Sequence, residues 1–237
     1  MALVTGGSGS LGAAICRCLG AAGHFVYVHA NRRLDEAQAV AREIIDAGGQ
    51  ARAVAFDVTD AEAARAVLER LVGEAPIQIL VNSAGIHDDA AFPGMSADQW
   101  RRVIDVSVNG FYNVTQPLML PMIRTRWGRV ITLSSVTALL GNRGQVNYAA
   151  AKGALNAATR SLSLEVASRG ITVNAVAPGV ISSEMSDSVF DASAIAKLVP
   201  MKRAGTADEV ASLVDYLASS EAGYITGQII SISGGLA

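Results

Sequence analysis

The sequence predicts an α/β fold in which a mainly seven-stranded parallel sheet carries helices on both faces. Three observations lead to this prediction. Short apolar runs of strand length alternate with longer segments of helical periodicity along the chain. A glycine-rich turn joins the first strand to the first helix. The 237 residues are 51% hydrophobic and 17% charged, which is typical of one globular domain with a substantial core.

The first half of the chain predicts three strand–helix pairs and a fourth strand. Residues 2–5 form a short apolar run before glycines, and residues 11–22 are an alanine-rich helical stretch. The same pattern recurs as a strand at 24–30, a helix at 35–47, a strand at 51–57 and a helix at 61–72. Residues 77–82 are then expected to form the fourth strand.

The second half continues the alternation. Helices are expected around 97–122, at 148–168 and at 207–218, and strands at 128–134, 171–177 and 228–232. Such alternation produces a parallel sheet, because right-handed crossovers place helices on both faces. We therefore expect a single doubly wound Rossmann domain over residues 1–237. The irregular stretch at 180–201 is a candidate lid over substrate.

Composition excludes several classes of function. The net charge of -2, with scattered lysines and arginines, provides no basic field for nucleic acid. No apolar run is long enough to cross a bilayer, and the N-terminus lacks the features of a signal peptide, so we expect a cytoplasmic protein without membrane contact. Cys16 and Cys18 lie two residues apart on an expected helix and are interpreted as packing residues. No metal site is predicted.

The turn after the first strand is a candidate phosphate site. Backbone amides and the helix dipole can hold a pyrophosphate where a glycine-rich turn opens a helix. The alternative is that the glycines serve only tight packing of strand against helix. The predicted contacts are Gly6, Ser8, Gly9, Ser10, Leu11 and Gly12.

This turn resembles the TGxxxGxG motif of the short-chain dehydrogenase/reductase superfamily, with Ser10 in place of its second glycine. Two further segments that end strands resemble the superfamily's adenine-contacting Asp-Val pair and its NNAG motif. They supply Asp57, Val58, Asn82, Ala84 and Gly85 as expected cofactor contacts, with Ser83 in place of the second Asn. Asn82 is also expected to stabilise the central sheet.

The residues after the second strand predict which nicotinamide cofactor binds. NAD-binding folds usually place an acidic side chain there for the ribose 2′-hydroxyl, whereas this chain has Ala30. Asn31, Arg32 and Arg33 follow, and arginines attract a 2′-phosphate. We therefore expect NADPH (or its oxidised form NADP) rather than NADH. The alternative is that both arginines are solvated and neutralised by nearby carboxylates.

Tyr148 and Lys152 are the candidate catalytic pair. Spacing of i and i+4 at the start of a helix places both side chains on one face. A tyrosine pKa near ~10 must fall for proton exchange near neutrality, and a neighbouring ammonium favours that fall. Ser135, thirteen residues earlier, is expected to bind the substrate carbonyl, with Ser134 as its rival. A YxxxK pattern alone occurs often by chance, so its position after the serine-ended strand carries the argument.

The resemblance implies roles for these residues. Tyr148 would donate a proton and also contact the cofactor, and Ser135 would polarise the carbonyl. Lys152 would bind the nicotinamide ribose and pass protons inward. The superfamily's catalytic Asn falls on Ser107, while Asn109 is expected to point elsewhere on the helix. The segment after the sixth strand resembles the PGxIxT stretch that holds the nicotinamide carboxamide. Its expected contacts are Pro178, Gly179, Ile181 and Ser183, with Ser183 in place of the threonine; the alternative is an ordinary Pro-Gly turn.

Within the superfamily the chain is most similar to bacterial 3-oxoacyl-(β-ketoacyl)-acyl-carrier-protein reductases. The similarity is carried by residues 144–152 and 168–174. It implies reduction of a carrier-bound 3-oxoacyl thioester, a homotetramer, and docking of the acidic carrier protein by Arg126 and Arg169. Ser107 and Ser10 suggest a divergent member, serving polyketide or aryl-polyene-type synthesis rather than fatty-acid biosynthesis. The alternatives are a general NAD(P)-dependent alcohol, ketone or sugar dehydrogenase, and a catalytically silent nucleotide-binding scaffold.

Overall fold

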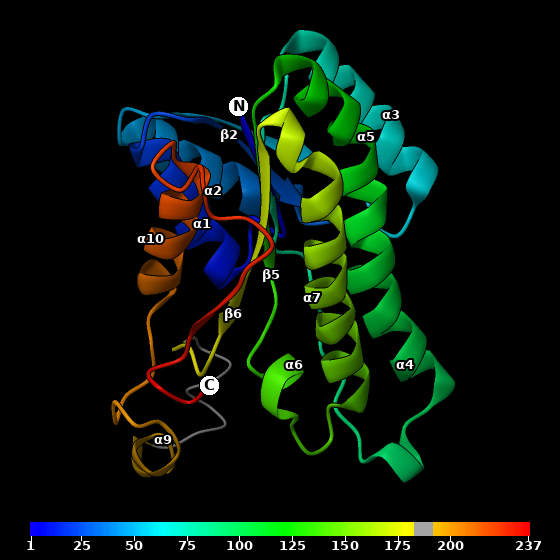
Figure 1. Cartoon of the computed structure of the whole chain (residues 1–237), viewed down its shortest axis with the longest axis vertical. Helices are drawn as coiled ribbons and strands as arrows, with labels where there is room; N and C mark the ends of the chain where they lie inside the picture. Colours follow the sequence, from blue (N-terminus) through cyan, green and yellow to red (C-terminus); the bar gives the residue numbers. More distant parts are fainter. Residues whose placement is uncertain (183–191) are drawn as a thin grey trace.

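All seven predicted strands form, and they pair in parallel into one sheet (Figure 1). The computed structural model describes residues 1–182 and 192–237. The strand order is β3-β2-β1-β4-β5-β6-β7, as expected for a doubly wound Rossmann fold. The strands are β1 (Ala2–Thr5), β2 (Phe25–Ala30), β3 (Gln50–Ala55), β4 (Ile79–Asn82), β5 (Gly128–Leu133), β6 (Ile171–Pro178) and β7 (Ile229–Ile232).

Helices cover both faces of the sheet (Figure 1). One face carries α1 (Ser10–Ala21), α2 (Leu34–Asp46) and α10 (Ala207–Ala218). The other carries α3 (Ala61–Glu74), α4 (Ala97–Ile104), α5 (Gly110–Thr125) and α7 (Val146–Val166). Two short helices, α6 (Thr137–Leu140) and α9 (Ala192–Leu198), lie beyond the carboxyl ends of the strands.

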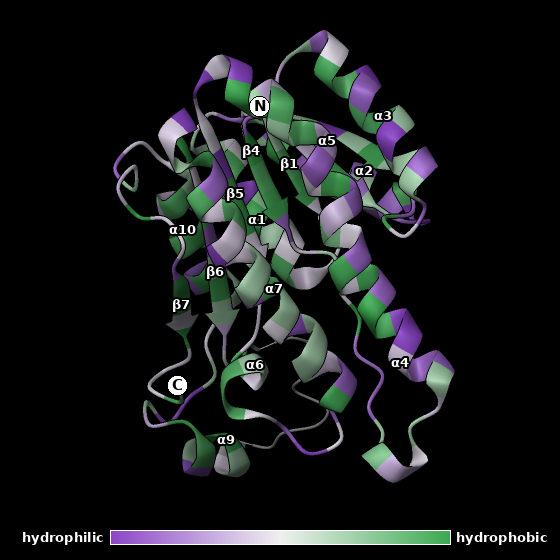
Figure 2. Cartoon of the chain, turned by 45° about the vertical axis from the view of Figure 1, so that its right-hand side comes forward, coloured by the Kyte–Doolittle hydropathy of each residue, from purple (hydrophilic) through white to green (hydrophobic). Residues whose placement is uncertain are grey.

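The core has two layers, one on each face of the sheet. Neighbouring strand residues point to opposite faces, so Val4 packs toward α1 and α2 while Leu3 packs toward α3 and α5. Figure 2 shows hydrophobic colouring along the central strands, between helices whose outer faces are more polar. A near-continuous apolar strand is typical of a parallel sheet that is buried on both faces.

The expected helix at 97–122 is wrong in one respect, because it is divided. A π-helical turn, η2 (Asp105–Asn109), separates α4 from α5. Single π turns are frequent at functional sites. The other expected elements begin and end within about two residues of the observed ones. The short elements α6, α9, η1 (Phe92–Gly94) and η3 (Ala167–Arg169) were not predicted, since three to seven residues carry no readable periodicity.

The topology fixes where a ligand can bind. Chain order reverses between β1 and β4, and such a switch point opens a crevice at the carboxyl ends of the strands. Thr5 at the end of β1 pairs in register with Asn82 at the end of β4. The glycine-rich turn and the segment after Asn82 therefore lie side by side at this crevice.

Two other features bear on the sequence predictions. No helix in residues 1–182 and 192–237 is long and apolar enough to cross a membrane. Of the candidate lid at 180–201, residues 192–198 form α9 beyond the carboxyl edge of the sheet, whereas residues 183–191 lie outside the described residues.

Candidate active site

The glycine-rich turn packs directly against the helix that it opens. Gly6 has a φ of +64°, which favours glycine. A Cβ on Gly12 would lie 2.2 Å from the carbonyl oxygen of Gly6, so only glycine allows α1 to approach this closely. The amide of Gly9 donates to the same carbonyl at 3.1 Å. The two outer glycines of the motif are thus required by a tight strand-to-helix connection.

Packing does not account for the whole turn, because several of its amides remain open. No residue in the described part of the chain accepts a hydrogen bond from the amides of Ser8, Ser10 or Leu11. Gly9 is the N-cap of α1 and supplies no side-chain cap. Unpaired amides at a helix N-terminus bind anions. The residues present therefore fit the pyrophosphate of a dinucleotide, and the exposed Ser10 leaves this end of the helix accessible.

The two arginines that follow β2 differ in whether a carboxylate already pairs with them. Arg33 forms an ion pair with Glu36 at 2.5 Å, so the predicted neutralisation by a carboxylate holds for this arginine. Arg32 is exposed and lies near Asp57, where its charge helps to lower the pKa of that carboxyl. The largest cause of that lowering is the hydrogen bond from the Thr59 amide, and the Asn31 side chain also contributes to it. Arg32 is therefore the cation better placed for a 2′-phosphate.

The segment after β4 is tied to the glycine-rich turn. The hydroxyl of Thr5 accepts hydrogen bonds from the amides of Ser83 and Ala84, both at 3.0 Å. The Asn82 side chain donates to the Thr115 hydroxyl at 3.0 Å, which joins β4 to α5 and is the expected structural role. On the β3 side, Val58 is buried and packs against Gly110. The glycine-rich turn and the segments after β3 and β4 therefore all lie at the crevice.

Ser135, Tyr148 and Lys152 lie together at the carboxyl edge of the sheet. Ser135 follows β5, and its side chain lies close enough to the Tyr148 phenol to lower the pKa of that group. The ammonium of Lys152 lies 5.5 Å from the centroid of the Tyr148 ring and donates to the Leu133 carbonyl at 2.7 Å. Ser134, the rival of Ser135, instead donates to the Lys152 carbonyl at 3.4 Å. The geometry thus favours Ser135 as the serine beside the tyrosine.

Burial dominates the ionisation of both catalytic candidates. It raises the pKa of the Tyr148 phenol; the neighbouring Ser135 hydroxyl opposes this rise and the charge of Asp89 adds to it. Burial also lowers the pKa of Lys152 to about 8. In the protein without cofactor the pKa of Tyr148 is therefore shifted upward, opposite to the lowering expected from the ammonium and the positive nicotinamide ring together, because desolvation is the largest cause of the shift. A protonated phenol suits a proton donor.

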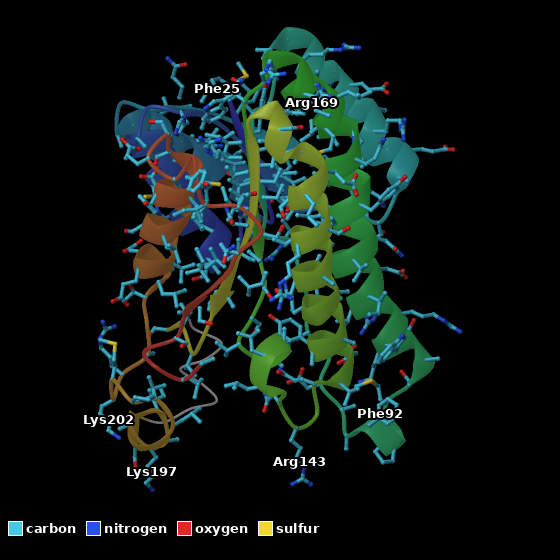
Figure 3. The ribbon with its side chains drawn as sticks, in the orientation of Figure 1. Phe25, Phe92, Arg143, Arg169, Lys197 and Lys202 are labelled. Carbon is cyan, nitrogen blue, oxygen red and sulfur yellow. The ribbon has the colours of Figure 1, made fainter. Side chains whose placement is uncertain are left out.

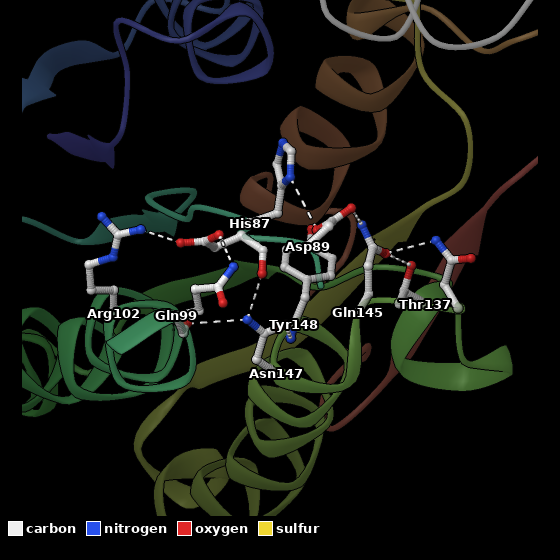
Figure 4. Close-up of polar contacts among 10 residues, drawn as sticks. His87, Asp89, Gln99, Arg102, Thr137, Gln145, Asn147 and Tyr148 are labelled. Carbon is white, nitrogen blue, oxygen red and sulfur yellow. Dashed lines mark hydrogen bonds and ion pairs between the residues drawn. The ribbon is translucent and has the colours of Figure 1, made fainter. Parts of the chain in front are cut away.

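A polar network that the sequence prediction missed holds the start of α7 in place (Figure 4). Asn147 is fully buried, and its side-chain oxygen accepts from the Tyr148 amide at 2.8 Å. Its side-chain nitrogen donates to the carbonyls of Asp88 and Gln99. Asp88 in turn pairs with Arg102. The available signal was an Asn in the first turn of a helix, where such side chains bond to the backbone.

Ser107 lies in the π turn η2 and is buried, and its hydroxyl has no hydrogen-bond partner among residues 1–182 and 192–237. It lines a cavity of about 10 Å³ together with Thr5, Asn82 and Ala84, among others. A polar cavity of ~10–15 Å³ holds one water molecule. Asn109 points elsewhere, as expected: it is exposed and donates to Asp105 at 2.7 Å. The geometry fits a water held by Ser107.

The segment after β6 is anchored to its neighbours. Val136 donates to the Pro178 carbonyl at 3.0 Å, and Gly179 donates to the Ile232 carbonyl at 2.9 Å. Ile181 forms a bridge with Gly205. Pro178, Gly179 and Ile181 thus lie at the carboxyl edge of the sheet, and each is hydrogen-bonded or bridged to a neighbouring segment. Ser183 falls outside the described residues.

Arg126 and Arg169 lie together but far from Tyr148 within the chain. Arg126 donates to the Ser168 carbonyl at 3.2 Å, and both arginines precede the strands β5 and β6. They therefore occupy the amino edge of the sheet, and Figure 3 shows Arg169 at the end opposite to Arg143 and Lys197. The length of β6, eight residues at about 3.3 Å each, separates the two edges.

Comparison with known proteins agrees with this geometry. Residues 1–194 match the short chain dehydrogenase family. The chain is 41% identical over 236 residues to the 3-oxoacyl-[acyl-carrier-protein] reductase FabG of Aggregatibacter actinomycetemcomitans, covering 99% of this chain and 98% of the relative. FabG of Escherichia coli (strain K12) is 40% identical over 239 residues, covering 100% and 96%. Nodulation protein G of Rhizobium sp. (strain N33) is 41% identical over 239 residues, covering 100% of this chain and 96% of the relative. The chain belongs to the short chain dehydrogenase family, and it is an oxidoreductase that acts between alcohol and carbonyl groups with a nicotinamide cofactor.

Proposed function

We propose that this protein reduces a 3-oxoacyl thioester on acyl carrier protein to the 3-hydroxyacyl form, using NADPH in the cytoplasm. The observation that carries the proposal is the grouping of Ser135, Tyr148 and Lys152 at the carboxyl edge, beside open amides of a phosphate turn. Relatives at about 40% identity over the whole chain bear the name of this reductase.

The chain's own residues divide the chemical work. When bound, NADPH supplies a hydride to the substrate carbonyl carbon. The Ser135 hydroxyl donates a hydrogen bond to the carbonyl oxygen and orients it, and the Tyr148 phenol gives its proton to the alkoxide that develops there. Lys152 holds the nicotinamide ribose. Its ammonium also restores the proton to Tyr148.

The route by which protons reach Lys152 is specific to this chain. Ser107, at the position of the superfamily's Asn, faces a cavity that has the size of one water molecule. A buried hydroxyl without a partner carries an energetic penalty that a water relieves. We infer that Ser107 and one water replace the longer amide side chain.

Cofactor choice follows from the end of β2. Ala30 offers no carboxylate to a ribose hydroxyl, and Asn31 and Arg32 are exposed beside Asp57. Arg32 supports binding of the 2′-phosphate, and Arg33 contributes less because Glu36 already pairs with it. These contacts support NADPH over NADH.

Carrier docking at Arg126 and Arg169 requires more than one subunit. Both arginines lie at the amino edge, a sheet length away from Tyr148 of the same chain. A carrier bound there would deliver its acyl group to a neighbouring subunit of the proposed homotetramer. Exposed apolar side chains on α5 and α7, namely Tyr112, Leu120 and Leu164, support an assembly through these helices.

The test compares substrates with the purified full-length chain. Acetoacetyl-carrier protein, acetoacetyl-CoA, simple ketones and sugars are each offered with NADPH and with NADH. We expect the highest kcat/KM for the carrier substrate with NADPH. Equal kcat/KM values for carrier and simple ketones would instead identify a general alcohol or ketone dehydrogenase. Absence of turnover with every substrate would identify a silent nucleotide-binding scaffold.

A second candidate function rests on one observation. Relatives named nodulation protein G match the chain as closely as the reductases do. A role in a specialised polyketide or aryl-polyene-type pathway, rather than in fatty-acid biosynthesis, is compatible with the same chemistry. Acyl carriers from the two kinds of pathway, compared as substrates by kcat/KM, distinguish these alternatives.

A further inference from the structure

His29 is a buried imidazole between two cofactor segments, and it has no role in the chemistry proposed above. It lies on β2 and is 1% exposed. The glycine-rich turn that follows β1 lies on one side of the ring. The segment leading to Asp57, after β3, lies on the other.

Each ring nitrogen has one defined partner. The Gly6 amide donates to Nδ1 at 3.1 Å, so Nδ1 acts as an acceptor. Nε2 lies 2.9 Å from the Phe56 carbonyl oxygen, which can only accept. The imidazole is therefore neutral, with its proton on Nε2. Burial favours the same state, because it lowers the pKa of His29 to about 4.

The backbone of the same residue adds a third link. The Gly7 amide donates to the His29 carbonyl at 2.8 Å. The ring also packs on Phe56, with centroids 4.1 Å apart. One residue thus fixes two successive amides of the phosphate turn and joins that turn to the segment before Asp57 and Val58. Both segments are the ones expected to hold the two ends of the adenosine diphosphate.

We propose that His29 is a positioning residue for the dinucleotide, which aligns the phosphate turn through Gly6 and sets its distance from the adenine segment through Phe56. This inference rests on the proposed use of the turn for NADPH. The Gly6 amide donates its hydrogen bond to the imidazole, so the orientation of this peptide group is fixed before a ligand binds. The open amides of Ser8, Ser10 and Leu11 then point to the phosphates without reorganisation.

The experiment separates the two ring contacts with paired variants. His29→Asn places an amide oxygen near the position of Nδ1 and retains the acceptor for Gly6. His29→Gln reaches the position of Nε2 and loses that acceptor. Tyr27→Phe is the control, because Tyr27 lies on the same face of β2 and its hydroxyl also accepts one side-chain hydrogen bond, from Arg52. The NADPH dissociation constant is measured by calorimetry, alongside the melting temperature of the free protein and steady-state kinetics.

We expect His29→Gln to weaken NADPH binding about tenfold or more, because the Gly6 peptide is no longer held in the orientation that aligns the phosphate turn. His29→Asn keeps the Gly6 acceptor but loses the Phe56 contact, so it should weaken NADPH binding less than His29→Gln does. Tyr27→Phe should remain within about threefold of wild type, and kcat at saturating NADPH should change little in all three. Wild-type affinity in His29→Gln, or equal losses in His29→Gln and His29→Asn, would overturn the assignment. A role in stability alone would lower the melting temperature and leave the dissociation constant unchanged, which also overturns it.

Variants that fail to fold still leave a decisive measurement. Nitrogen NMR of the wild-type imidazole should show a proton on Nε2 and a shift of Nδ1 when NADPH is added; a proton on Nδ1, or no response to NADPH, contradicts the proposal. If the wild-type protein binds neither NADPH nor NADH, the proposed function fails and this inference fails with it. If it binds NADPH and the His29 variants match it, only the inference fails.

Discussion

Replacing Gly12 with alanine tests the phosphate turn most severely. The added Cβ would lie 2.2 Å from the Gly6 oxygen, 2.8 Å from its carbonyl carbon and 2.9 Å from the Gly7 Cα. All three are backbone atoms, so no side chain can move aside. Because ordinary contact begins at 3.4 Å, the turn and α1 must separate by about 1.2 Å.

That displacement exceeds the tolerance of amide–phosphate hydrogen bonds, which span about 2.7–3.2 Å. Hydrogen bonds to charged groups contribute roughly 1.5–3 kcal/mol each, so loss of even one weakens NADPH binding roughly 10-fold to 100-fold. Overpacking also costs roughly 1–3 kcal/mol of folding free energy. The assay is calorimetric titration with NADPH, after circular dichroism and a melting curve show that the variant is folded.

The matched control is Gly73→Ala, another glycine on a helix. A Cβ at Gly73 in α3 meets nothing within 4 Å, so this exchange should leave the dissociation constant unchanged and the fold slightly more stable. Folded Gly12→Ala protein with an NADPH dissociation constant within about threefold of wild type would refute the reasoning.

The remaining predictions concern the cofactor, the lysine and the proton route. Arg32→Asp should lower the NADPH-to-NADH ratio of kcat/KM at least tenfold. Arg33→Asp should lower this ratio less, because Glu36 already neutralises Arg33. Equal ratios in wild type and Arg32→Asp would exclude the 2′-phosphate contact. Burial lowers the pKa of Lys152 to about 8, so the ammonium prevails below that pH and the amine above it. The kcat/KM should therefore fall as pH rises through 8, and a profile flat from pH 7 to 9 would contradict this. Ser107→Ala should reduce kcat roughly threefold to tenfold and alter the solvent isotope effect, whereas unchanged values would remove Ser107 from the proton route.

Much of the fold was predictable from the sequence because parallel strands buried on both faces read as short apolar runs. The parallel sheet and the helices on both of its faces follow from alternation and handedness, whereas the strand order comes from the structure. The division of the helix at 97–122 was not predictable, since a π turn changes hydrogen bonding without interrupting the apolar pattern. The expected fold class is confirmed.

The site was predictable to the extent that chain position determines it. Ser135, Tyr148 and Lys152 follow from a strand end and a helix start, and the structure brings them together. Asn147 and His29 were missed because their importance lies in contacts with residues distant in sequence. The sequence named neutralisation by a nearby carboxylate as an alternative for both arginines, and only the side-chain geometry shows that Arg33 pairs with Glu36.

The position of Arg126 and Arg169 at the amino edge of the sheet is another feature that the sequence alone does not show. A family motif identifies residues, but only topology shows that they precede β5 and β6, while Tyr148 lies at the opposite edge. Any role for them in carrier docking therefore depends on assembly.

The central claim is that Tyr148 donates the proton, and Tyr148→Phe tests it most directly. The variant removes one oxygen from a partly buried ring and leaves the phosphate turn and the adenine segment unchanged. Removal of a general acid costs roughly 10²–10⁴-fold in rate. We predict an NADPH dissociation constant within about threefold of wild type, together with a kcat for acetoacetyl-carrier protein reduced at least 100-fold. A kcat within tenfold of wild type would contradict the account.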